Sequence, residues 1–97
     1  MRALLFAVAI FAAAPAVAQA PAASRLTLAD PGRAPAGRTI IDGANWRCEG
    51  VACTASGGVS QPAARACRRV TQRLGPVTAF AWKGVELSAA ELALCNA

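Results

Sequence analysis

The sequence predicts a small α+β domain stapled by two disulfides, with the element order (β)-ββ-α-ββ-α. Two strand–turn–strand patterns, two helical patterns and an even number of cysteines downstream of an apolar N-terminal segment support this fold class. The cysteines are Cys48, Cys53, Cys67 and Cys95. In a short exported chain such a set indicates a disulfide framework. A domain of this size buries little apolar surface, so the bridges explain how it stays folded.

Residues 1–18 have the pattern of a secretory signal peptide. Arg2 supplies a positive charge, residues 3–14 are uniformly apolar, and small residues precede a cleavage site that we place after Ala18. The apolar run is shorter than the ~20 residues that a membrane-spanning helix needs. The cleavage site carries no cysteine, which argues against a lipid-anchored form. We therefore expect a periplasmic or secreted protein with no transmembrane segment after signal removal.

Residues 19–38 predict a flexible leader. The segment is rich in proline, alanine and glycine, and its only sizeable apolar residues are Leu26 and Leu28. Such a composition buries too little surface to offset the entropy lost on ordering. The folded domain is therefore expected over residues 39–97, and it begins with the β-branched triplet Thr39–Ile41 as a short strand.

Two hairpins are expected in this domain. The first has Gly50-Val51 as its turn, with glycine in the first position that a type II′ turn requires. This register places Cys48 opposite Cys53 in a non-hydrogen-bonded pair, where α-carbons approach to about 4.5 Å, a distance that a disulfide accepts. The second hairpin covers residues 78–87 and turns at Lys83-Gly84.

A helix is expected between the hairpins, from the N-cap residue Ser60 to the Gly75-Pro76 stop signal. Apolar residues at three- and four-residue steps predict its buried stripe, which consists of Ala63, Cys67, Val70 and Leu74. A capping box formed by Ser88 and Glu91 opens a short last helix.

With Cys48 paired to Cys53, the remaining bridge joins Cys67 to Cys95 and so ties the two helices together. A zinc site is the competing interpretation. It is disfavoured because the sequence has one close cysteine pair instead of two, and no histidine.

The arrangement of cysteines resembles a family of small exported alphaproteobacterial proteins of uncharacterised function. The resemblance covers about half of the chain, from Trp46 to Asn96. Its motifs are Trp46-x-Cys48-x4-Cys53, the helical Cys67, residues 74–80 and Leu92-x-x-Cys95-Asn96. It implies an exported domain and no known activity or site residues.

The composition argues against an enzyme. Histidine and tyrosine are absent, and no Ser-His-Asp, Cys-His or metal-ligand grouping can be assembled. The carboxylates fall in the leader, at turns or at a helix cap; they are Asp30, Asp42, Glu49, Glu86 and Glu91. We therefore expect neither catalysis nor a cofactor or metal.

The most prominent candidate surface is the basic face of the middle helix, formed by Arg65, Arg68, Arg69 and Arg73. Clustered arginines can bind a polyanion such as lipopolysaccharide phosphate or an acidic glycan. The alternative is an ordinary solvated helix face, which most amphipathic helices have. Nucleic acid is disfavoured by the compartment and by the scarcity of aromatic side chains for base stacking.

Trp46 and Trp82 have two interpretations as well. They are core residues if buried, and candidate anchors for a partner protein if exposed. The first functional hypothesis is a binding module for another envelope protein. The second is binding of a polyanion through the arginine-rich helix face.

Overall fold

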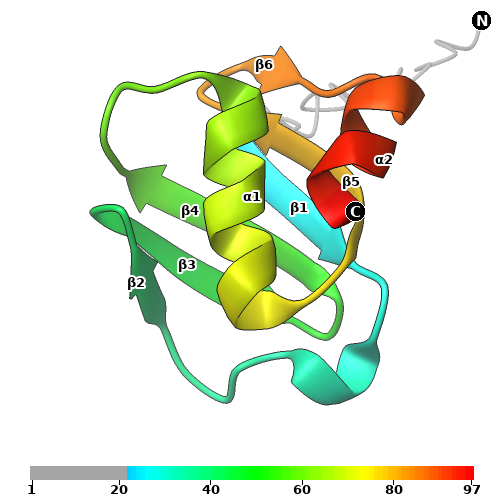
Figure 1. The fold of residues 1–97 in the computed structure, drawn as a ribbon. Coiled ribbons are helices and arrows are strands. Elements are labelled where there is room, and N and C mark those ends of the chain that lie inside the picture. Colours follow the sequence, from blue (N-terminus) through cyan, green and yellow to red (C-terminus); the bar gives the residue numbers. More distant parts are fainter. Residues whose placement is uncertain (1–21) are drawn as a thin grey trace, which may run out of the picture.

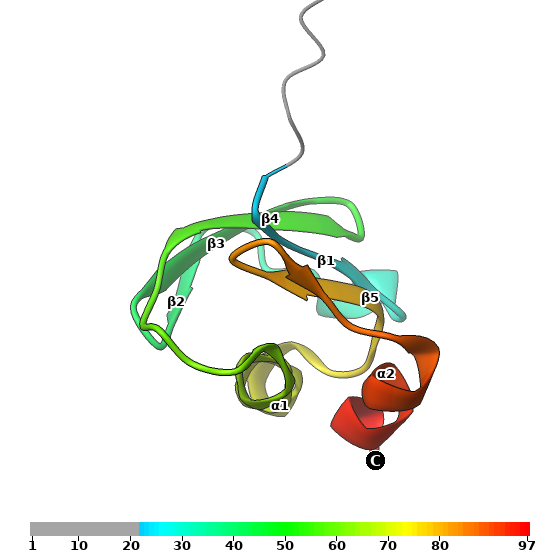
Figure 2. The same cartoon turned by 90° about the horizontal axis from the view of Figure 1, so that it is seen from above.

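The computed structural model describes residues 22–97 and shows a six-stranded antiparallel sheet with two α-helices packed on one of its faces (Figures 1 and 2). The strand order across the sheet is β2-β3-β4-β1-β5-β6. In chain order the elements are β1 (Ser24–Leu28), the 3₁₀ helix η1 (Pro31–Arg33), β2 (Thr39–Ile41), β3 (Ala44–Glu49), β4 (Ala52–Gly57), α1 (Ala63–Leu74), β5 (Val77–Trp82), β6 (Val85–Glu86) and α2 (Ala89–Asn96). The α+β class is confirmed, with β1 and η1 as additions. The predicted signal peptide and the cleavage site after Ala18 lie outside the described residues.

Strand β1 corrects the prediction that residues 19–38 form a flexible leader. It lies in the middle of the sheet, antiparallel to both β4 and β5. Leu26 and Leu28 are only 3% and 2% exposed, because they point into the core while Arg25 and Thr27 point to the other face. The strand was missed because the proline- and glycine-rich residues after it dominate the composition of the segment.

The first hairpin is confirmed with the predicted register. Cys48 lies opposite Cys53 and Glu49 opposite Ala52. Gly50 begins the turn with a φ of 61°, a value that glycine adopts without strain.

Strand β2 is also confirmed, and it pairs with β3 in a further hairpin. Asp42 and Gly43 both have positive φ, at 49° and 77°, as a two-residue type I′ turn requires. This turn brings β2 to one edge of the sheet and places Asp42 close to α1.

Helix α1 begins later than predicted. Ser60 does not cap it; the N-cap is Pro62, with no side-chain hydrogen bond. Proline suits this position because it has no N–H, and an N–H at the start of a helix would have no partner within the helix. The end is as predicted: Gly75 has φ 82°, and its N–H donates to the Thr71 carbonyl at 2.9 Å. A Cβ at Gly75 would lie 2.7 Å from Nε of Arg33, so the side chain of Arg33 covers this helix end closely.

The second hairpin and the last helix follow the prediction. Lys83 and Gly84 form the turn with φ values of 48° and 87°. The capping box at the start of α2 is present in full, with Ser88 Oγ accepting from the Glu91 N–H at 3.2 Å and the Glu91 carboxylate accepting from the Ser88 N–H at 3.0 Å.

Both predicted disulfides are confirmed. Cys48–Cys53 joins β3 to β4 with the α-carbons 4.0 Å apart, and Cys67–Cys95 joins α1 to α2 with the α-carbons 5.9 Å apart. Every cysteine is therefore bonded. None is left as a zinc ligand or a reactive thiol, so the bridges exclude the competing zinc interpretation in this structure.

Candidate functional site

Helix α1 presents the predicted arginines on the side that faces away from the sheet. Its opposite side is buried and consists of Ala63, Ala66, Cys67, Val70 and Leu74. Arg65, Arg68, Arg69 and Arg73 are all exposed. The helical period thus gathers the four predicted residues on one surface, as expected.

One of the four is already occupied. Arg69 donates to the Asp42 carboxylate through Nε and Nη2, with distances of 3.2 to 3.3 Å. Gln61 donates to the same carboxylate through Nε2 at 3.1 Å. The group ties the β2–β3 turn to α1, so Arg69, a predicted candidate for binding a polyanion, already has an acidic partner within the protein. No local pattern signals this contact, because Asp42 precedes Arg69 by 27 residues.

The contact favours the charged form of Asp42. Hydrogen bonds from Arg69 and Gln61, together with the positive charge of Arg69, hold the pKa of Asp42 below its usual value. Arg65 adds a weaker attraction in the same direction. Within residues 22–97, no acidic side chain forms an ion pair with Arg65, Arg68 or Arg73. We call these three residues the α1 arginines.

Both tryptophans lie in the core, which overturns their role as candidate partner anchors. Trp46 is 0% exposed and Trp82 is 2% exposed. The ring of Trp46 packs against Phe80 and Trp82, with centroids 6.1 Å and 6.4 Å apart. The three rings fill the space between sheet and helices, and none reaches a partner at the surface.

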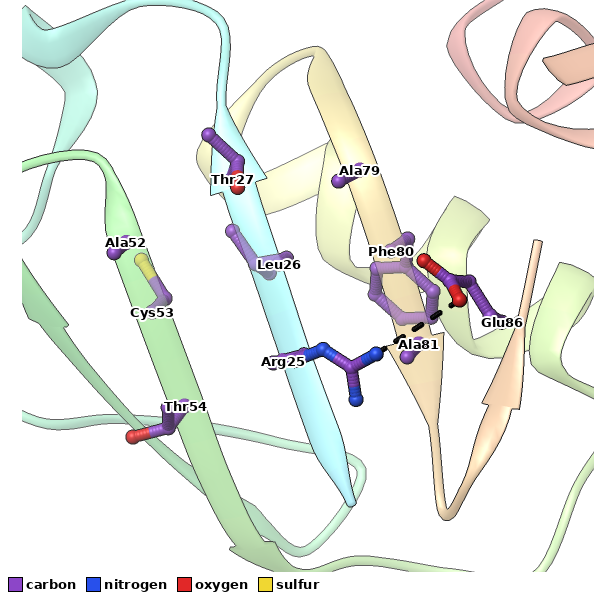
Figure 3. A pocket seen from close by; sticks show the side chains of 10 residues that line it. All are labelled: Arg25, Leu26, Thr27, Ala52, Cys53, Thr54, Ala79, Phe80, Ala81 and Glu86. Atoms are coloured by element: carbon purple, nitrogen blue, oxygen red, sulfur yellow. Dashed lines mark ion pairs between the residues drawn. The ribbon is translucent and has the colours of Figure 1, made fainter. Parts of the chain in front are cut away.

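The face of the sheet opposite the helices carries a shallow hollow of about 170 Å³ over β4, β1 and β5 (Figure 3). Small side chains from these strands line it, including Thr27, Ala52 and Ala79. At one side Arg25 reaches across the sheet to Glu86, with an N–O distance of 3.9 Å. The hollow is smaller than the roughly 300 Å³ of typical small-molecule sites. This surface was not predictable from the sequence, because it depends on β1 lying in the middle of the sheet.

Most carboxylates have structural partners. Besides Asp42 and Glu86, Asp30 accepts from the Gly32 N–H at 2.9 Å in η1. Hydrogen bonds with Ser88 in the capping box lower the pKa of Glu91. The bond from the Ser88 backbone has the largest effect. Across residues 22–97 there is also no group of three or more histidine, cysteine, aspartate or glutamate residues that could hold a metal ion.

The described residues define a small disulfide-bonded α+β domain with an exposed basic helix face. A family model described as a family of unknown function (DUF8200) matches residues 6–97, and the chain belongs to this family. No curated protein and no solved structure matches the chain. In the part of the chain that the structure describes, no helix is long and apolar enough to cross a membrane.

Proposed function

We propose that this protein is an exported, non-catalytic binding protein whose α1 arginines hold a polyanion of the cell envelope. The observation that supports it is the exposure of Arg65, Arg68 and Arg73 on one side of α1 with no ion pair inside the described chain. Guanidinium groups bind phosphate and carboxylate oxygens in a bidentate manner. Lipopolysaccharide phosphates and acidic glycans are envelope ligands of this chemistry.

The spacing of the α1 arginines favours a ligand with several anionic groups. From Arg65 to Arg73 the helix rises about 12 Å, which is more than one phosphate or carboxylate can span. A polymer or an array of anionic groups can contact all three arginines together. Arg69, which is bound to Asp42, fixes this side of α1 to the β2–β3 turn.

Export is part of the proposal. Residues 1–18 have the charge, the apolar run and the small residues of a signal peptide, with cleavage expected after Ala18. The two disulfides support an oxidising compartment such as the periplasm or the exterior.

Salt-dependent binding to soluble polyanions tests this function. The oxidised protein from Gln19 onwards would be titrated with long-chain polyphosphate and with alginate, a carboxylate glycan. The test variant is Arg65→Gln/Arg68→Gln/Arg73→Gln. The control variant, Arg38→Gln/Arg47→Gln/Lys83→Asn, removes the same charge elsewhere, with asparagine at position 83 because φ is positive there.

We expect the test variant to lose at least tenfold in affinity and to show a smaller salt dependence, with the control close to the wild type. Equal loss in both variants would mean that only net charge matters and would reject a site on α1. If the wild type binds neither polyphosphate nor alginate, the proposed function is rejected.

Binding to another envelope protein is the second candidate. The buried tryptophans no longer support it, and it now draws on the hollow in the open face of the sheet. Crosslinking in the native envelope separates the two candidates. A protein captured equally by the wild type and by the triple arginine variant would favour this second candidate.

A further inference from the structure

Helix α2 exposes an apolar stripe. Three exposed residues on one face of the helix form it, Ala90, Ala93 and Leu94, and the exposed C-cap residue Ala97 continues their spacing. Leu94 is 72% exposed, the largest value among the exposed large apolar side chains of the described chain. The core contacts of α2 come from Leu92 and Cys95 on the other side.

The polar side chains of α2 are held in hydrogen bonds elsewhere and do not cover this stripe. Glu91 is held in the capping box with Ser88. Asn96 makes two hydrogen bonds with the backbone of Val77, donating to its carbonyl at 2.7 Å and accepting from its N–H at 2.9 Å. The outer surface of α2 therefore consists of the apolar stripe, flanked by Glu91 and Asn96, which are exposed but held in hydrogen bonds. A helix that is apolar on both sides is typical of one that is covered on both sides.

The α2 stripe and the α1 arginines lie on the same side of the molecule. Figure 2 shows both helices in one layer beneath the sheet. The Cys67–Cys95 bridge holds them together, with the α-carbons 5.9 Å apart. Because each helix buries its sheet-facing side, the arginines and the stripe both point away from the sheet. This helix layer therefore combines an exposed leucine on α2 with three positive charges on α1 that form no ion pair within residues 22–97.

A bilayer with anionic headgroups matches this combination. A soluble glycan or polyphosphate would contact the arginines and gain nothing from an apolar stripe beside them. A bilayer surface offers phosphates to the arginines and an acyl boundary to the leucine, the pairing typical of interfacial helices. Arginine can also lay its methylene groups along apolar surface while its guanidinium stays at the headgroups.

We propose that the α1 arginines and the α2 stripe together bind the surface of an anionic lipid bilayer, with Leu94 entering the headgroup–acyl boundary. This inference rests on the proposed function, since it specifies that a lipid bilayer carries the anionic groups that the α1 arginines bind. The attachment is peripheral and reversible, because one large apolar side chain and three arginines give far less membrane affinity than a spanning helix.

Vesicle cosedimentation tests the proposal on the oxidised protein. The vesicles are equimolar phosphatidylglycerol and phosphatidylcholine, with pure phosphatidylcholine as the uncharged comparison. Leu94→Ser is the test variant, and Ile40→Ser is its control, since Ile40 is an exposed apolar residue on β2. Both variants are also titrated with soluble polyphosphate.

We expect the wild type to prefer the anionic vesicles and Leu94→Ser to lower its partition coefficient on them about tenfold. Its affinity for polyphosphate should stay unchanged, while the triple arginine variant loses both. If Leu94→Ser partitions like the wild type, or if the wild type binds polyphosphate and no vesicle, the lipid inference is overturned and the polyanion function stands. If the wild type binds neither ligand, both are overturned.

Discussion

At the scale of single residues, the tightest constraint lies between Gly58 and Trp82. Gly58 follows β4 with a φ of 102°, a conformation that residues with a side chain rarely adopt. A Cβ at this position would lie 2.5 Å from Cη2 of Trp82 and 3.1 Å from Cβ of Ala44. The buried indole ring can therefore keep its place only because position 58 has no side chain.

Gly58→Ala should lower the free energy of unfolding by about 2 to 4 kcal/mol, the sum of the positive-φ strain and the displaced ring. Gly84→Ala is the matched control, because Gly84 also has positive φ but no atom lies within 4 Å of the place a Cβ would take there. The control should lose only about 1 kcal/mol. Urea denaturation of the two oxidised variants measures the difference; equal losses would show that Trp82 does not constrain this position.

At the scale of elements, β1 decides how the sheet is assembled. It separates the β2–β3–β4 meander from the β5–β6 hairpin and pairs with both. Without β1 both parts would expose an unpaired strand edge, and the β5–β6 hairpin would be a two-stranded sheet, which is marginally stable at best in water. The two leucines of β1 supply the apolar contacts of this strand, which joins the two parts of the sheet.

Leu26→Ala should therefore destabilise the protein by about 3 kcal/mol through loss of burial and the cavity left behind. Ala36→Ser, in the exposed loop after η1, should change stability by less than about 0.5 kcal/mol. Thermal denaturation followed by circular dichroism distinguishes the two. A Leu26→Ala variant as stable as the wild type would restore the flexible leader that the composition predicted.

At the scale of the whole molecule, the two disulfides close loops of different length. Cys67 and Cys95 are 28 positions apart, and Cys48 and Cys53 are 5 apart. The longer loop restricts the unfolded chain more, and in the chain-entropy model it contributes about 3.6 kcal/mol against about 2.2 kcal/mol for the shorter one.

Replacing Cys67 and Cys95 together by alanine should consequently lower the melting temperature more than replacing Cys48 and Cys53 by alanine. Scanning calorimetry of the two double variants gives the ranking, and the reverse order would contradict the loop-length argument. The intact mass of the oxidised protein supplies the control, since two bridges make it four hydrogens lighter than the reduced chain.

The local parts of the fold were predictable from sequence. The long-range parts were not, except for the Cys67–Cys95 bridge, which followed once Cys48 was paired with Cys53. The Cys48–Cys53 register follows from one glycine in a two-residue turn, and the α2 cap follows from Ser88 and Glu91. The place of β1 could not be predicted this way, because two leucines in a polar segment do not reveal which strands lie beside them. The same limit applies to the candidate site: periodicity placed the arginines on one face, but only the fold shows that Asp42 occupies Arg69.

The central position of β1 also has a consequence for the time course of folding. β1 is synthesised before the rest of the described domain, yet Leu26 lies opposite Phe80 in β5, a strand that follows much later in the sequence. The sheet therefore cannot close until β5 has been made, and pairings between residues so far apart in the sequence predict slow folding, in milliseconds or longer. For the proposed export, the consequence is that the leading part of the chain cannot complete this sheet before β5 has been made.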